Sequence, residues 1–438
     1  MTFRSFHLNA TAPDDPGTTS LRYYLHDMAA RISERHGEGL FRLAVDRVFT
    51  LPGHGTVVTG TVYSGQVRTG DTVAVMPAGM QVRVRSIHTQ NRASESGQAG
   101  QRCALNLAGV KKSTISRGNW LADPHALAPT TRVDVRLRLL ADSRLTLRSW
   151  SPVHVHLGTA HCMAHVVLLE SESLSAGESA QVQLVFDTPI CAIPGDRFIA
   201  RDAQATHTVG GGVVLDPFAP ARKRRSAERL RYLGALERMI AGDGVAPLLQ
   251  HALYGVKMSV LVQLTGHPPA RISLPPDAIT VDTGHERFVL LDLHWHALRE
   301  CAVTALRDFH AEATDEPGPD IGRLRRIALP HLSDALWRAL INQLAHERIV
   351  MRSGPWLHLP EHTVTLSEGD QALARKLQPL IAAGRFDPPW VRIWRPRCAS
   401  QRSECASCYA SWSRRAPCIR SCMISSTTAN ASVNSPMS

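Results

Sequence analysis

A run of strand-like segments between residues 41 and 214 constrains the fold of this chain most strongly. From Phe41 onward, apolar and polar residues alternate, and the segments are separated by short turns that carry glycine. Alternation with a period of two places successive side chains on opposite faces of a strand, whereas a helix needs a spacing of three or four. Helical patterns return only after residue 215. The sequence therefore predicts closed β-barrels.

Changes in composition divide the chain into predicted domains. One barrel is expected over 38–125 and a second over 130–218, with a proline-bearing linker between them. Helical periods followed by short strand pairs then predict winged helices over 222–300 and 301–365. The predicted fold class is a multi-domain chain of two β-barrels followed by α+β winged-helix domains.

The two ends of the chain differ from this pattern. Residues 1–37 predict a short strand and an amphipathic helix over 20–36, whose apolar face has no partner within that segment. Residues 366–397 begin like a third winged helix. Residues 398–438 hold 11 serines, five cysteines, one acid and no apolar period, so no core can be built from them. Their composition resembles that of a segment translated in a shifted reading frame, and a disordered tail is expected. The cysteine spacing matches no paired zinc knuckle.

The net charge of +11 is unevenly spread. Residues 391–438 carry seven arginines and one acid, which gives +6 and leaves only +5 for the first 390 residues. Arg222, Lys223, Arg224 and Arg225 form the main basic run outside that tail. This run could contact nucleic-acid phosphates or begin a solvated helix, and we expect a weak RNA-facing or interdomain role.

The location of the protein is predicted from what the sequence does not contain. No stretch approaches 18 consecutive apolar residues, and the N-terminus has no secretory pattern. Cysteines outside the tail occur singly in apolar contexts, which is typical of reduced core thiols. We expect a cytoplasmic monomer without membrane contact.

Several motifs resemble a known family. Arg42-Leu-Ala-Val-Asp46-Arg47, Gly53-His-Gly-Thr-Val-Val-Thr-Gly60 and Gly100-Gln-Arg102 resemble the second domain of translational GTPases, and selenocysteine-specific elongation factors most closely. Pro194-Gly-Asp-Arg-Phe198 and Thr208-Val-Gly-Gly-Gly212 resemble the last strands of the third domain in the same superfamily. The resemblance covers 38–218 and extends over 222–390 through winged helices of the kind that this factor appends.

The resemblance implies a GTPase domain with a phosphate loop, a magnesium-binding switch and a guanine reader. The chain contains no Gly-Lys or Asn-Lys dipeptide, so it has neither the phosphate-loop motif nor the guanine-binding motif. Residues 1–37 resemble only the end of such a domain. We therefore expect a truncated factor with no catalytic residue and no cofactor of its own, the GTP and Mg²⁺ of the family belonging to the missing domain.

The resemblance also implies a pocket for the aminoacyl group of selenocysteinyl-tRNA, formed by Asp46, Arg47 and Arg102. A selenol is ionised at neutral pH, so two guanidinium groups would favour it, while Asp46 could orient an arginine and contact the ammonium. The alternative is an ordinary surface salt bridge between exposed strands. The further partners that the resemblance implies are the ribosome and the selenocysteine-insertion mRNA hairpin.

A group of histidines lies around one predicted turn of the second barrel: His154, His156, His161 and His165. Alternate histidines share a strand face and could bind zinc or copper, but only Cys162 is near at ligand spacing. A barrel-surface or tRNA-facing role is expected, and no metal.

Two functional hypotheses remain open from the sequence. The first is a truncated selenocysteine-specific elongation factor that keeps the barrels contacting tRNA. The second is a stand-alone nucleic-acid-binding regulator built from barrels and winged helices, which would bind without GTP and with a steep salt dependence.

Overall fold

The computed structural model describes residues 7–8, 11–12, 15–31, 38–53, 55–143, 145–365, 369, 371–372 and 375. The chain divides into two compact units, Met1–His251 with Met258–Pro275, and Ala252–Lys257 with Pro276–Ser438. The predicted tail at 398–438 lies outside the described residues, as does nearly all of 366–397. Among the described residues, no helix is both long enough and apolar enough to cross a membrane.

Helix α1 (Pro16–Arg31) begins four residues before the predicted start of the helix at residue 20. The Asp15 carboxylate caps it by accepting hydrogen bonds from the Thr18 backbone N–H at 2.6 Å and the Thr18 hydroxyl at 3.0 Å. Proline fits the first turn because its missing N–H would have no helical partner there. The cap thus moves the helix start ahead of the apolar period.

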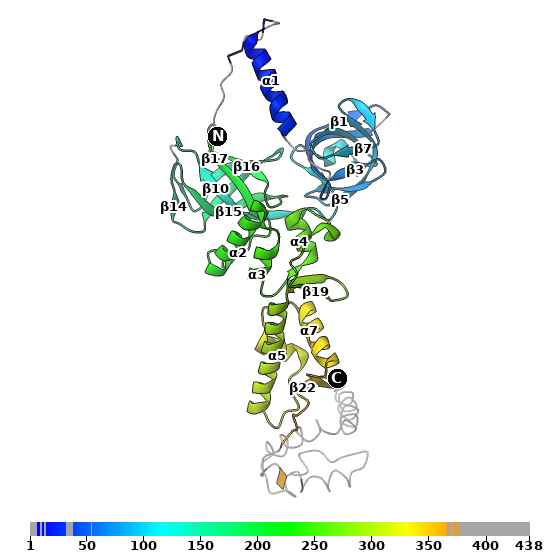
Figure 1. The fold of residues 1–438 in the computed structure, drawn as a ribbon, viewed down its shortest axis with the longest axis vertical. Helices are drawn as coiled ribbons and strands as arrows, with labels where there is room; N and C mark the ends of the chain where they lie inside the picture. The colour runs from blue at the N-terminus through cyan, green and yellow to red at the C-terminus, as the bar shows by residue number, and fades with distance from the viewer. Residues whose placement is uncertain are drawn as a thin grey trace, which may run out of the picture. The chain divides into compact units, whose positions relative to one another are not determined.

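The first barrel is built from one antiparallel sheet closed on itself (Figure 1). The strand order is β4-β9-β1-β2-β8-β5-β6, and β4 also pairs with β5, while β3 pairs with β7. Its core is aliphatic, with Leu43, Val58 and Leu105 fully buried. The strands are β1 (Arg42–Leu51), β2 (Gly55–Ser64), β3 (Gln66–Arg68), β4 (Thr72–Met76), β5 (Met80–Thr89), β6 (Arg92–Ser94), β7 (Ser96–Gln98), β8 (Arg102–Leu107) and β9 (Trp120–Ala122).

The second barrel is closed in the order β10-β15-β13-β12-β16-β17. A Cβ atom on Gly212 would lie 1.8 Å from the carbonyl oxygen of Arg136, so β17 can approach β10 this closely only with glycine. The strands are β10 (Thr130–Leu139), β11 (Leu147–Arg148), β12 (Ser151–Leu157), β13 (Ala160–Leu168), β14 (Ser173–Leu174), β15 (Ser179–Ile190), β16 (Arg197–Arg201) and β17 (Thr208–Asp216). The two barrels confirm the predicted β architecture.

Three α-helices follow the second barrel in the described part of the first unit. They are α2 (Ala227–Arg238), α3 (Ala246–His251) and α4 (Met258–Thr265). The Ser226 hydroxyl caps α2 by accepting a hydrogen bond from the Arg229 backbone N–H at 3.2 Å. The boundary between the compact units falls inside the range 222–300 that was predicted as a single winged helix.

Up to residue 359, the described part of the second unit contains a small sheet, three α-helices and a hairpin (Figure 1). Strands β18 (Val256–Lys257), β20 (Arg287–Leu291) and β19 (Ala278–Asp282) form the sheet in that order. Helices α5 (Asp292–Glu312), α6 (Ile321–Ala328) and α7 (Asp334–His346) share an apolar core that contains the fully buried Trp337 of α7. Strand β21 (Met351–Ser353) pairs with β22 (Trp356–His358). Helices followed by a two-stranded wing match the predicted winged-helix order.

Candidate functional site

Asp46 occupies an irregular position in the first barrel. In the ladder between β1 and β2, Val45 pairs with Gly60 and Arg47 pairs with Thr59, so Asp46 has no residue opposite it. One extra residue in one strand is a β-bulge, which bends the strand and redirects its side chains. The predicted acidic residue of the pocket is therefore also the bulged residue.

The Asp46 carboxylate binds two side chains from neighbouring strands. The Thr59 hydroxyl donates a hydrogen bond of 2.6 Å to Asp46 Oδ1. Arg102 donates from Nε to Oδ2 at 3.1 Å and from Nη2 to Oδ2 at 2.9 Å. The Asp46 side chain is 27% exposed and that of Arg102 is 56% exposed, so the group lies at the barrel surface and is accessible to a ligand.

The charges around Asp46 keep it ionised. Burial alone would raise the pKa of the Asp46 carboxyl, but hydrogen bonds from Thr59 and Arg102, together with the charges of Arg102 and Arg47, hold that pKa below its ordinary value. Arg47 is exposed on β1 beside the bulge. Asp46 and Arg102 thus come together, and Arg47 adds a second positive charge that acts on the Asp46 carboxylate.

Arg102 does not use its whole guanidinium on Asp46. Nε and Nη2 make the contacts to Asp46 and Thr59, and Nη1 makes no hydrogen bond within the described part of the chain. A guanidinium with one free edge can still donate to an anion while the carboxylate fixes its plane. The arrangement can bind a small anionic group at the rim of the barrel.

Thr59 was not among the site residues predicted from the sequence. It lies in the run Thr56-Val-Val-Thr59, where threonine is an ordinary β-former and no local pattern sets it apart. Its position across the strands from the bulge is what gives it a role.

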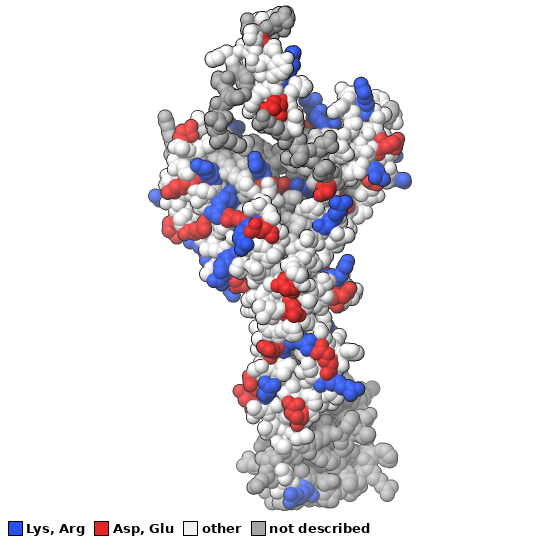
Figure 2. Space-filling view, in the orientation of Figure 1, with Lys and Arg blue, Asp and Glu red and all other residues white. Residues whose placement is uncertain are grey.

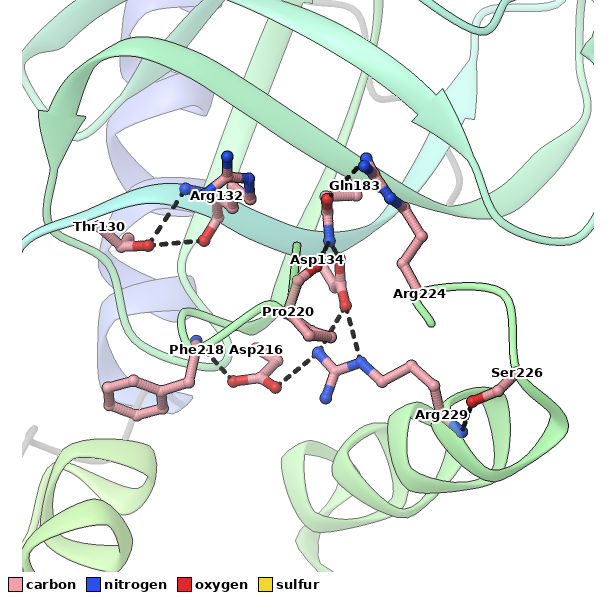
Figure 3. Close-up of polar contacts among 10 residues, drawn as sticks. All are labelled: Thr130, Arg132, Asp134, Gln183, Asp216, Phe218, Pro220, Arg224, Ser226 and Arg229. Carbon is pink, nitrogen blue, oxygen red and sulfur yellow. Dashed lines mark hydrogen bonds and ion pairs between the residues drawn. The ribbon is translucent and has the colours of Figure 1, made fainter. Parts of the chain in front are cut away.

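The predicted basic run 222–225 divides into two parts. Arg224 donates from Nη1 to Gln183 Oε1 at 3.0 Å (Figure 3). It also donates from Nη2 to the Ala221 carbonyl at 3.1 Å. Arg225 donates to the Leu168 carbonyl at 2.9 Å and pairs with Glu172. Arg222 and Lys223 are exposed. Two of the four predicted nucleic-acid contacts therefore attach the linker to the second barrel.

A buried ionic network, also not predicted from the sequence, adjoins this linker. Arg229 of α2 reaches the carboxylates of Asp134 and Asp216, donating to Asp216 Oδ2 at 2.7 Å (Figure 3). Both carboxylates are almost fully buried, and Gln183 donates to Asp134 Oδ1 at 2.9 Å. Burial raises the pKa of the Asp134 carboxyl despite its arginine partner. The network fixes α2 to the barrel.

A second pair, of opposite sense, lies farther along the same two elements. Arg136 of β10 donates to Glu237 of α2 from Nε at 2.6 Å and from Nη2 at 2.9 Å. Strand β10 thus carries the acid Asp134 before the base Arg136. In the opposite order, α2 carries the base Arg229 before the acid Glu237. Only one register of the helix on the strand satisfies both pairs.

The histidine group lies on β12 and β13. His161 Nε2 is 2.8 Å from His154 Nδ1, and the ring of His156 stacks on that of His161 at 4.5 Å. Burial, followed by the proximity of His161 and Arg201, lowers the pKa of His156. No group of three or more His, Cys, Asp or Glu among the described residues is arranged to hold a metal ion.

Positive charge does not dominate the visible surface. Figure 2 shows Lys and Arg side chains interspersed with Asp and Glu side chains on the described part of this face. The described part of this face therefore presents mixed charge and not a broad basic field.

Three family models match parts of this chain. Residues 55–122 match elongation factor Tu domain 2, and residues 130–221 match the β-barrel domain of selenocysteine-specific elongation factor. Residues 303–359 match the winged helix of elongation factor SelB. The order of these matches follows the order of domains that the sequence predicted.

Curated relatives carry the same description. The selenocysteine-specific elongation factor of Escherichia coli is 34% identical over 395 residues, covering 87% of this chain and 59% of that protein. The one from Haemophilus influenzae is 29% identical over 365 residues, covering 83% and 57%. This chain therefore spans less than two thirds of the length of these relatives.

A solved structure agrees in fold. The crystal structure of a bacterial selenocysteine-specific elongation factor aligns with a TM-score of 0.61 and 18% identity, covering 84% of this chain and 57% of that one. At this identity the likeness supports the shared fold alone.

Proposed function

The chain is a relative of the selenocysteine-specific elongation factors, and from this premise we propose that its barrels bind the aminoacylated end of selenocysteinyl-tRNA. Asp46, Arg47 and Arg102 contact the aminoacyl group. The guanidinium groups attract the selenolate, which is ionised at neutral pH, and the Asp46 carboxylate faces the ammonium.

The observation that carries this proposal is the redirected Asp46. An exposed Asp–Arg pair by itself contributes about 0–1 kcal/mol and needs no function. Here the acid stands on a bulge, is fixed by two donors and lies beside a second, exposed arginine. Bulges occur preferentially beside functional sites, where they redirect a side chain.

Contacts with the ribosome and with a recoding mRNA hairpin belong to the same proposal. The winged helix at 303–359 is the candidate for the hairpin. A cytoplasmic location is part of the same proposal. The exposed Arg222 and Lys223 are candidates for phosphate contacts beside the barrel.

The test compares two ligands that differ in one atom. Selenocysteinyl-tRNA and seryl-tRNA, made on the same tRNA, are titrated against the chain at fixed salt. We expect selenocysteinyl-tRNA to bind at least about tenfold more tightly, which is a difference of about 1.4 kcal/mol. Arg102→Ala should remove that difference. Equal binding of both ligands by the wild-type chain would overturn the proposal.

A further inference from the structure

At the bulge, strand pairing does not fix the direction of the Asp46 side chain. A regular antiparallel ladder fixes each side chain through the residue opposite it. Asp46 has no such residue, because Val45 and Arg47 take consecutive partners on β2. Contacts with other side chains must therefore fix the direction of the Asp46 side chain.

Gly60 allows the two strands to meet at this point. A Cβ atom on residue 60 would lie 2.1 Å from the carbonyl oxygen of Ala44 and 2.6 Å from Leu43 Cδ2. Any side chain there would push β1 away from β2. The close approach brings the neighbouring residue of β2, Thr59, within reach of the bulge.

The Thr59 hydroxyl lies between the two charged groups of the site. It donates to Asp46 Oδ1 at 2.6 Å and accepts from Arg102 Nη2 at 3.4 Å. A hydroxyl has one donor and two acceptor positions, so it can serve both partners at once. Its bond to the carboxylate is a charge-assisted hydrogen bond, which is stronger than one between neutral groups.

We infer that Thr59 is a positioning residue, whose hydroxyl holds the Asp46 carboxylate so that Arg102 keeps Nη1 free for the aminoacyl group. This inference rests on the proposed function. Thr59 need not touch the ligand, because it acts through Asp46. With the hydroxyl removed, the carboxylate can rotate, and Arg102 then loses the fixed plane that directs its free edge.

Three variants separate this role from ordinary strand packing. Thr59→Val keeps the branched shape and removes the hydroxyl, whereas Thr59→Ser keeps the hydroxyl. Thr61→Val makes the same change two residues along the same strand, at an exposed position opposite Arg102. All three keep residues that strands tolerate, and thermal unfolding verifies that each chain folds.

The first readout is the titration of Asp46 itself, followed by carboxyl-carbon NMR of the full chain labelled at aspartate. In the wild-type chain the hydrogen bond from Thr59 contributes to the lowered pKa of Asp46. We expect this pKa to rise in Thr59→Val, and to stay near the wild-type value in Thr59→Ser and Thr61→Val. An unchanged titration in Thr59→Val would overturn the inference.

The second readout is binding of selenocysteinyl-tRNA and seryl-tRNA. Thr59→Val should weaken binding of the selenium ligand about tenfold, as expected for losing a hydrogen bond to a charged group, while Thr61→Val stays within about threefold of wild type. Equal losses in Thr59→Val and Thr61→Val would contradict positioning. Unaltered binding in Arg102→Ala would instead defeat the proposed function, and the NMR titration would still decide whether Thr59 holds Asp46.

Discussion

Arg42 of the first barrel and Asp196 of the second form a buried, two-pronged ion pair. Arg42 Nη1 lies 3.0 Å from Asp196 Oδ2 and Nη2 lies 3.2 Å from Oδ1, with side chains 6% and 10% exposed. The Arg42 guanidinium also lies over the Trp120 ring at 5.2 Å. The pair links the two barrels within one compact unit.

Breaking this pair should be costly. Arg42→Met leaves Asp196 buried without its cation, and we expect a loss of about 3 kcal/mol in the free energy of unfolding, measured by urea denaturation. Arg102→Met removes an exposed pair and should cost about 1 kcal/mol or less. Similar losses in the two variants would show that burial does not set the strength of the Arg42 pair.

Gly60 and Gly234 predict opposite effects of the same substitution. Gly60→Ala places a methyl group against the Ala44 carbonyl and should destabilise the first barrel by several kcal/mol. Gly234 lies in α2, and apart from the helix's own backbone and the adjacent residues no described atom lies within 4 Å of an added Cβ, so Gly234→Ala should raise stability by about 0.5–1 kcal/mol. Thermal unfolding of both variants checks the pair, and a stable Gly60→Ala chain would contradict the tight approach.

The two halves of the basic run should separate by experiment. Replacing Arg222 and Lys223 together by alanine should lower the salt dependence of tRNA binding by about one to two in log–log slope, without loss of stability. Arg224→Ala should instead lower stability, because Gln183 loses its donor. Fluorescence anisotropy at several salt concentrations, paired with unfolding curves, measures both. A larger salt effect from Arg224→Ala would reverse the assignment.

Arg229 should dominate the attachment of α2. Arg229→Met leaves Asp134 and Asp216 buried without a cation, so we expect a loss of about 3–5 kcal/mol in urea denaturation. Arg231→Met, on the exposed side of the same helix, is the matched control and should change stability by less than about 0.5 kcal/mol. Comparable losses would mean that α2 is not held by this network.

The second unit should lose stability in mild acid because of His310. This imidazole is 7% exposed, neither ring nitrogen makes a hydrogen bond in the described part, and its ring stacks on that of His362 at 3.7 Å. Burial, followed by the nearby His362 and His358, lowers the pKa of His310 to about 4. The unfolded chain therefore takes up this proton first as the pH falls from about 6.5 to about 4, and stability declines over that window.

His310→Phe should flatten this dependence. Phenylalanine keeps a ring against His362 and cannot take up a proton. Urea midpoints at pH 7 and pH 4.5 should differ less in His310→Phe than in the wild-type chain, whereas His346→Gln, at the exposed end of α7, should leave the difference unchanged. An unaltered difference in His310→Phe would assign the acid sensitivity to other groups.

The sequence predicted the barrels because the period of two is local and repeats along each strand. It could not predict the Arg229 network in the same way. Asp134 alternates with Val133 and Val135 as an outward-facing polar residue would, yet it is fully buried because α2 covers that face. Burial of an outward face depends on what packs there, which a strand's own pattern does not contain.

The candidate site shows the same limit. Asp46 and Arg102 are 56 residues apart, so only the resemblance joined them before the structure brought them within hydrogen-bonding distance. Thr59 was missed because a threonine among valines looks like an ordinary strand residue. The basic run was predicted as one unit because sequence proximity cannot show that Arg224 meets Gln183, 41 residues earlier.

The reversed charge order on β10 and α2 bears on how such factors can be recombined. A chimera that takes α2 from this chain carries Arg229 and then Glu237, and it fits only a barrel whose β10 carries an acid and then a base. Joining two proteins at the boundary between the barrel and α2 would separate the partners of these charge pairs. The barrel and α2 should therefore be exchanged together, with the junction placed after α2.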